Sequence, residues 1–501
     1  MEIFGNGKFF CADQANTFVK YLGINKGKIV FAENFIPEKY KNYPFTDLKG
    51  KTAVPGFGDS HIHFSSYAYF AGGFDFRDFH STEEAVSGLK IFSQGQKPGS
   101  LITGFGYSPN KENQDLILNK NVLDSFVNDK PVFIIKYDGH AGIGNSAFLN
   151  AVSPEILKTR GADPETGWFL NDSFFPAADF AAKSVSPFQM LKRMSAASKK
   201  LAEYGISFID SSEGVGYPFD LDVDLTRFAS KFLKQDIKVF FQTMNTKKVN
   251  LRRLKQIGGC FDTALDGCFG SCDAALNKPY SHNNNDKGIL FYKDEEVENF
   301  FYKTFSQNLQ TAVHAIGDRA SDQCINSFLK ADKKYPAPDR RNILIHGDLI
   351  SDEAIEKAAS LNLFFAVQPS FLYWDEEPLS YLEKILGNRT KNIIPIRSLI
   401  QSGICVTGGS DAPCTKPDPL HGIWAAVNHP NENQRISIYE AVKLYTANAA
   451  LSRFEENKRG QLKKGLLGDF AVLSDDIFET SNEDIKNIKV DMLYIKGKKA
   501  F

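Results

Sequence analysis

Two histidines separated by one residue are the first feature of the sequence that could carry chemistry. His61 and His63 lie at the end of the apolar run 52–64. Because side chains i and i+2 of a strand point to the same face, both imidazoles would converge on one point. A pair of this kind also occurs in half-buried strands without a ligand, so it needs support from elsewhere in the chain.

That support comes from three further apolar runs that end in a residue able to bind a metal. The residues are His314, His346 and Asp411. Imidazole nitrogens and carboxylate oxygens are ligands of Zn²⁺ and similar divalent ions. The pattern predicts a metal site that holds one or two divalent ions, with zinc the expected metal. A structural role for the same histidines is the alternative.

The elements that must position these residues form a regular pattern of apolar run, loop and helix-like segment. A helix is expected over 352–362, with Ser351 as its N-cap and acidic residues in the first turn. The runs are nearly continuous, as in parallel strands buried on both faces. They predict an α/β fold, a (β/α)8 barrel whose active site lies at the carboxyl ends of the strands. The eight runs are 52–64, 205–214, 237–245, 258–267, 310–320, 342–351, 363–370 and 404–413.

The rest of the chain is divided around this barrel. The two ends share short strand-like segments and turns, and we expect them to form one composite β-sandwich from residues 1–54 and 456–501. The barrel is assigned to residues 55–79 and 205–455. Residues 80–204 are too long for a single βα unit and are expected to form a subdomain inserted after the first barrel strand.

Composition narrows the class of protein. The 501 residues include 59 Lys+Arg and 60 Asp+Glu, a formal net charge of −1, which argues against a nucleic-acid or anionic-membrane binder. No stretch is apolar enough for a transmembrane helix, and the first residues lack the pattern of a signal peptide. Seven cysteines without a CxxC pair favour a reducing compartment. We therefore expect a cytoplasmic protein that acts on a small molecule, and its aromatic-rich ends and insertion could supply a homo-oligomer interface.

Several motifs together resemble the amidohydrolase superfamily. They are VPGFGDSHIHF, HAIGDRA and GSDAP at the strand ends and DGHAGIGNSAFL in the insertion. The branch that the chain is most similar to is amidohydrolase family 3, which includes N-substituted formamide deformylase. The resemblance implies a barrel with a small β-sandwich built from both chain ends. It also implies that His61 and His63 bind the more buried metal, that Asp411 bridges toward it and handles protons, and that His314 and His346 complete the site.

Two positions depart from the pattern of the family. Relatives commonly carry a lysine in the fourth strand that can bridge two metals, and the run 258–267 has none. The matching position is Asp262, with Cys260 close by, so a carboxylate, a thiolate or no bridging ligand at all are the alternatives. Relatives also often have Glu before His346, where this chain has Ile345.

The resulting hypothesis is a metal-dependent hydrolase of carbon–nitrogen bonds other than peptide bonds, acting on amide, N-formyl or N-acyl substrates. Metal-activated water would attack the carbonyl, with Asp411 as general base and acid and His346 beside the developing oxyanion. His140 and Asp318 are candidate substrate-binding residues, although Asp318 could simply cap a helix. The alternatives are a heterocycle deaminase, an ester or lactone hydrolase, or a barrel that binds a ligand without turnover.

Overall fold

The computed structural model describes residues 1–110, 116–215 and 217–501. Its centre is a nearly closed barrel of eight parallel strands in the order β21-β20-β19-β18-β17-β16-β15-β8. Each of the eight apolar runs overlaps one of these strands, so the (β/α)8 barrel is confirmed. The strands are β8 (Phe57–Ile62), β15 (Ile206–Glu213), β16 (Asp236–Phe241), β17 (Gln256–Ala264), β18 (Gln310–Ala315), β19 (Ile343–His346), β20 (Phe364–Val367) and β21 (Val406–Gly408).

Backbone hydrogen bonds join the first and last strands of the barrel at the end where the candidate residues lie. The amide of Asp411 donates to the carbonyl of His61 at 2.8 Å, and the amide of His63 donates to the carbonyl of Ala412 at 2.9 Å. Every residue of β8, β15 and β18 is buried, as expected for strands covered on both faces. The two ends of the sheet therefore meet directly beside His61 and Asp411.

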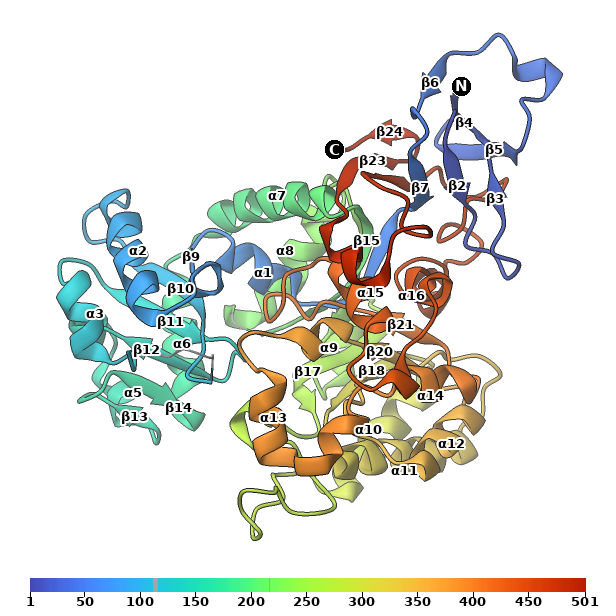
Figure 1. The fold of residues 1–501 in the computed structure, drawn as a ribbon. Coiled ribbons are helices and arrows are strands. Elements are labelled where there is room, and N and C mark those ends of the chain that lie inside the picture. The colour runs from blue at the N-terminus through green and yellow to red at the C-terminus, as the bar shows by residue number, and fades with distance from the viewer. Residues whose placement is uncertain (111–115, 216) are drawn as a thin grey trace.

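Helices surround the barrel (Figure 1). The helix expected after Ser351 is present, and the Ser351 hydroxyl accepts a hydrogen bond from the Ala354 amide. The helices that follow barrel strands are α1 (Phe64–Phe70), α7 (Pro187–Glu203), α8 (Leu221–Ala229), α9 (Thr246–Leu251), α10 (Asp294–Ser306), α11 (Asp318–Lys334), α12 (Asp352–Ser360), α13 (Leu379–Leu386), α14 (Ile396–Gln401), α15 (Pro419–Val427), α16 (Ile438–Leu444) and α17 (Ala447–Ser452).

Strands from both chain ends form the composite β-sandwich, where blue and red segments lie side by side in Figure 1. One sheet has the order β24-β23-β22-β7-β2-β3 and the other β5-β4-β1-β6. A shared apolar core, which includes Phe4, Phe9 and Phe470, holds them together. Their bounds are β1 (Glu2–Gly5), β2 (Lys8–Phe10), β3 (Phe18–Val19), β4 (Tyr21–Asn25), β5 (Lys28–Glu33), β6 (Phe45–Asp47), β7 (Thr52–Pro55), β22 (Phe470–Leu473), β23 (Val490–Ile495) and β24 (Lys498–Lys499).

The insertion after the first barrel strand forms a sheet of its own beside the barrel (Figure 1). The strand order is β13-β14-β12-β11-β10-β9. The domain boundaries given above stay a prediction. The elements are β9 (Phe74–Asp75), α2 (Thr82–Gln94), β10 (Ile102–Tyr107), α3 (Lys120–Phe126), β11 (Val132–Lys136), β12 (Ala141–Gly144), α4 (Ser146–Ala151), α5 (Pro154–Lys158), β13 (Ala162–Asp163), β14 (Trp168–Leu170) and α6 (Phe174–Lys183).

Within the described ranges, no helix combines the length and the apolar character that crossing a bilayer requires.

Candidate metal centre and pocket

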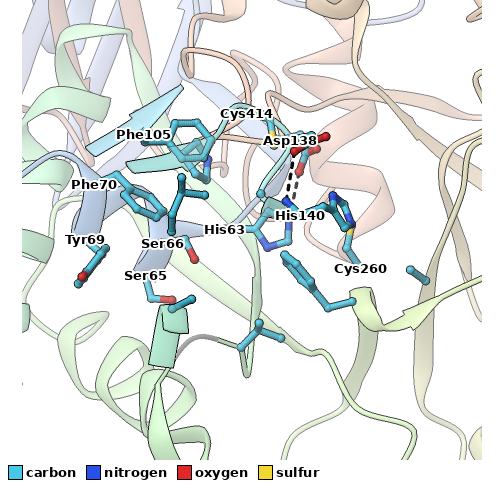
Figure 2. A pocket seen from close by; sticks show the side chains of 18 of the residues that line it. His63, Ser65, Ser66, Tyr69, Phe70, Phe105, Asp138, His140, Cys260 and Cys414 are labelled. Carbon is cyan, nitrogen blue, oxygen red and sulfur yellow. Dashed lines mark hydrogen bonds and ion pairs between the residues drawn. The ribbon is translucent and has the colours of Figure 1, made fainter. Parts of the chain in front are cut away.

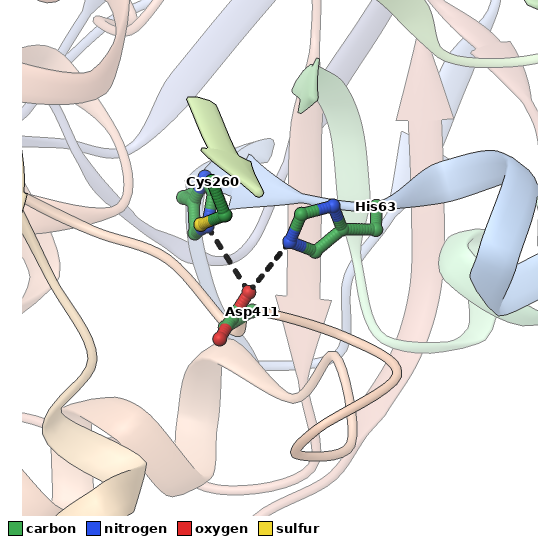
Figure 3. A group of neighbouring side chains, drawn as sticks. His63, Cys260 and Asp411 are labelled. Carbon is green, nitrogen blue, oxygen red and sulfur yellow. Dashed lines mark hydrogen bonds and ion pairs between the residues drawn. The ribbon is translucent and has the colours of Figure 1, made fainter. Parts of the chain in front are cut away.

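Three of the predicted ligands meet around one carboxylate oxygen. Asp411 Oδ1 lies 3.0 Å from His61 Nε2 and 3.1 Å from His63 Nε2. Figure 3 shows Asp411 and His63 facing each other with Cys260 beside them. The Ser212 hydroxyl lies 3.4 Å from His61 Nδ1, on the other side of that ring. A partner at Nδ1 orients the imidazole so that Nε2 faces the carboxylate, an arrangement typical of metal-binding histidines.

Cys260 connects this group to the other two predicted histidines. Its Sγ lies 3.4 Å from His61 Nε2 and 3.9 Å from His346 Nε2. The ring centroids of His314 and His346 are 4.5 Å apart. Two sets of donor atoms result, each within 4.8 Å of one another: His61, His63, Cys260 and Asp411, and Cys260, His314 and His346.

The protonation states of these residues suit ligands. Burial lowers the pKa of His61, and it lowers the pKa of His314 to about 4. Burial also lowers the pKa of His346 well below its usual value, with His314 adding to the effect. Burial opposes ionisation of Asp411, but the His61 and His63 imidazoles outweigh it and hold the pKa of that carboxyl well below its usual range. Neutral imidazoles beside an ionised carboxylate are the forms that bind a cation.

The donor set fits a divalent ion in a further respect. Asp411 Oδ1 and the Nδ1 atoms of His314 and His346 are buried and have no hydrogen bond of regular geometry with described residues. Buried polar atoms are rarely left in this way without a reason such as an ion. His346 and Asp411 also have positive φ angles of 72° and 53°, a backbone conformation that non-glycine residues seldom adopt outside functional sites.

The fourth strand supplies Cys260 and not Asp262. Asp262 is exposed and does not join either donor set. Residues i and i+2 would share a face in a regular strand, but the pairing of β17 with β18 shifts register between Gly259 and Ala264, and Phe261 has a φ of 49°. This bulge turns Asp262 away from the barrel axis. The structure therefore does not bring Asp262 to the other candidate ligands, whereas the Cys260 thiol, the alternative, lies among them.

Asp318, the second residue predicted to bind substrate, also lies away from the candidate ligands. Asp318 is the first residue of α11, and its Oδ1 accepts a hydrogen bond from the Asn277 amide at 2.8 Å. It is not among the residues that line the pocket over the metal ligands. Asp318 thus holds the loop at Asn277, and it does not cap α11, whose N-cap residue is Gly317.

His140 lies where it was expected, in the wall of a pocket that opens over the metal ligands (Figure 2). Its Nδ1 is buried without a hydrogen-bond partner among the described residues. Asp138, Cys268 and the His140 ring form a further group of donor atoms within 4.8 Å of one another. Asp138 already accepts hydrogen bonds from Lys136 at 2.6 Å and Ser271 at 2.9 Å, so its charge is compensated.

Sequence reasoning missed several residues of this pocket. Asp138 stands two positions before His140 and two positions after the end of β11, a signal that could have identified it. Glu377, which accepts a hydrogen bond from Tyr137 at 3.0 Å, and Asp222 lie in loop or helix segments without a motif. Only the fold brings these two carboxylates to the pocket.

Comparison with known proteins agrees with this arrangement. A family model described as the amidohydrolase family matches residues 45–501. YtcJ of Bacillus subtilis (strain 168) is 28% identical over 92% of this chain and 92% of its own length. N-substituted formamide deformylase of Arthrobacter pascens is 22% identical over 90% of this chain and 88% of its length. The crystal structure of a metal-dependent hydrolase from Pyrococcus horikoshii OT3 superposes with a TM-score of 0.78 at 23% identity, covering 96% of this chain and 99% of that one.

Proposed function

The chain belongs to the amidohydrolase family of metal-dependent hydrolases, and on that premise we propose that it hydrolyses the carbon–nitrogen bond of amides, with N-formyl and N-acyl amines as substrates. The observation that carries the proposal is the convergence of His61, His63, Cys260 and Asp411, the last three of which line a pocket. A relative named for deformylation of N-substituted formamides supports this choice of substrate.

Zn²⁺ is the proposed metal, and two ions are the proposed number. A thiolate with imidazoles and a carboxylate is a ligand set that zinc favours. His61, His63 and Asp411 would hold one ion, His314 and His346 would hold the other, and Cys260, which belongs to both donor sets, would contribute its thiolate. When bound, the divalent metal supplies an acidified water and polarises the scissile carbonyl.

Asp411 is the proposed proton carrier. It is ionised, buried and placed between the two histidines that follow the first strand. A carboxylate in this position accepts a proton from the attacking water and returns it to the leaving nitrogen. His140 Nδ1, which has no other partner among the described residues, can donate to the carbonyl oxygen as negative charge develops on it. His346 is proposed to lie beside the same carbonyl oxygen of the substrate.

The test is a screen of N-formyl, N-acyl and cyclic amides with zinc-loaded protein, zinc-stripped protein and the variant Asp411→Asn. We expect release of a substituted amine by the zinc-loaded wild type alone. Loss of about 10³-fold or more in kcat is expected for the variant, because it lacks the proton acceptor. Release of ammonia in place of a substituted amine would identify a deaminase. Hydrolysis of esters or lactones but no amide would also overturn the proposal.

A further inference from the structure

The walls of the pocket are made of aromatic rings that continue from the metal ligands. Phe261 stacks edge-on against His63 at 5.6 Å between ring centroids, and Phe371 lies parallel to His346 at 6.0 Å. Trp374 stacks on Phe371 at 4.7 Å. The insertion contributes Phe105 and Phe175. A substrate that reaches the proposed metal ligands would therefore contact ring faces and edges; Figure 2 labels Phe70 and Phe105 among the rings of the pocket.

The acidic side chains that line the same pocket are not balanced by basic side chains in its lining. Among the described residues that line the pocket, none is a lysine or an arginine, while four carboxylates line it in addition to Asp411. Asp138 is paired with Lys136, and Glu377 accepts a hydrogen bond from the neutral Tyr137 hydroxyl. Asp179 and Asp222 are not paired with a cation in the described part of the chain.

The contacts of Asp222 and Asp179 with the described residues do not include an ion pair. Asp222 is 1% exposed, and its Oδ2 accepts hydrogen bonds from the Gly214 and Val215 amides, whereas its Oδ1 has no partner among the described residues. Asp179 projects from α6 into the pocket, and Lys183, one turn further along that helix, is the cation that influences it. Burial raises the pKa of Asp179 and raises that of Asp222 to about 7.

The nearby arginines do not neutralise the charges of Asp179 and Asp222. Arg77 forms a two-point ion pair with Asp75, so its charge is neutralised within the insertion. Arg193 stacks on the ring of Tyr69 at 5.2 Å and donates to the Tyr69 carbonyl, and it does not line the pocket. A bound anion would thus meet uncompensated carboxylates and the negative faces of the rings, whereas a bound cation would find both favourable.

We infer that the pocket selects substrates whose body is aromatic and cationic or uncharged, and that it rejects substrates that carry a carboxylate or phosphate on that body. This inference rests on the proposed function for the reacting bond, but the selection itself concerns binding. Because aromatic faces and a buried carboxylate both favour an ammonium group, discrimination of about 100-fold between cationic and anionic forms is expected.

A matched set of three N-formyl benzylamines tests it: para-methyl (uncharged), para-aminomethyl (cationic) and para-carboxyl (anionic). We expect kcat/KM to be highest for the cation and lowest, by about 100-fold, for the anion. The same three formamides are titrated by calorimetry into the zinc-loaded Asp411→Asn variant, which reads binding without turnover. Binding in the expected order with no hydrolysis of any formamide by the wild type would overturn the proposed function alone. Equal binding of the three formamides would overturn the inference, whatever the turnover.

Substitutions of Asp179 and Asp222 test whether these residues set the preference for a cationic substrate. Asp179→Asn should lower the advantage of the cation over the uncharged compound about tenfold, and Asp179→Lys should restore binding of the anion. Asp222→Asn should act like Asp179→Asn, since the amide oxygen can still accept the Gly214 hydrogen bond. The matched control is Asp172→Lys, an exposed residue of the same insertion outside the pocket. An equal effect of Asp172→Lys would show that overall charge, and not the pocket, sets the preference.

Discussion

Asp59 and Ser410 tie the first barrel strand to the segment that follows the last one. Asp59 Oδ2 accepts a hydrogen bond from the Ser410 hydroxyl at 2.6 Å, and Oδ1 accepts from the Ser410 amide at 3.0 Å and the His61 amide at 3.2 Å. Ser410 directly precedes Asp411. One buried carboxyl thereby fixes the relative position of His61 and Asp411, the two ligands that come from opposite ends of the sheet.

Removing this link should loosen the metal centre without unfolding the protein. Asp59→Asn keeps the volume but loses one acceptor, and we expect metal affinity to fall about 10–100-fold. Equilibrium titration with a zinc chelator measures the change, and circular dichroism checks the fold. The control is Asp475→Asn, an exposed carboxylate near the C-terminus. Unchanged affinity in Asp59→Asn would show that the backbone alone positions the two ligands.

The thiol of Cys260 provides a spectroscopic test of the ligand set. Co²⁺ in place of zinc should give a sulfur-to-cobalt charge-transfer band in the near ultraviolet, because a coordinated thiol is deprotonated. We expect Cys260→Ser to lose the band. Cys414→Ser, which changes another thiol of the same pocket, should keep it. A band that survives in Cys260→Ser but not in Cys414→Ser would show that Cys414, and not Cys260, is the metal ligand.

Arg77 joins the insertion to the segment that follows Asp411, the proposed proton carrier. Its Nη1 donates to the carbonyls of Pro413 and Cys414, just after Asp411, while Asp75 holds the guanidinium in place. Arg77→Ala should lower kcat about 10–100-fold, because small displacements of a catalytic group are costly, and added guanidinium should restore part of the rate. Lys416→Ala breaks an exposed ion pair with Asp78 between the same two segments and is the matched control. Equal losses in both variants, with no rescue, would contradict a specific positioning role.

The sequence predicted the parts of the molecule that follow from local pattern. Eight apolar runs located eight strands, and because active sites lie at the carboxyl ends of such strands, His61, His63, His314, His346 and Asp411 could be placed together. Strand alternation also predicted that the imidazoles of His61 and His63 converge on one point.

What could not be predicted depends on departures from regular geometry and on contacts between distant segments. The bulge in β17 reverses the side of the strand on which Asp262 lies, and alternation counted along the sequence cannot show it. Asp222 and Glu377 reach the pocket from a helix and a loop whose positions only tertiary packing sets. Asp318 was equally compatible with two roles, since an acidic residue at a helix start fits both.

At the opposite end of the barrel, buried ionic contacts predict a pH-dependent stability. Asp236 accepts hydrogen bonds from Arg453 and Arg459, each at 2.8 Å, and from Lys458 at 3.0 Å. Burial opposes ionisation, but Arg459 and Arg453 outweigh it and lower the pKa of Asp236 to about 2. Because the folded pKa lies below the ordinary value of about 3.9, the stabilisation is present above pH 4 and is lost as the pH falls toward 2.

Asp236→Asn should therefore destabilise the protein by at least about 2 kcal/mol at pH 7, and the difference from wild type should shrink between pH 4 and pH 2. Thermal unfolding of both proteins across this range measures it. Asp491→Asn, which breaks an exposed ion pair with Lys51, should change stability by less than about 1 kcal/mol at any pH. A constant difference between wild type and Asp236→Asn down to pH 2 would refute the electrostatic explanation.

The most direct test of the metal centre is the number of divalent ions per chain, measured by plasma mass spectrometry on purified wild type and on the double variant His61→Ala/His63→Ala. The account predicts zinc at one to two equivalents in the wild type, and loss of at least one equivalent in a variant that remains folded. Equal metal content in the two proteins, or none in either after zinc loading, would contradict it.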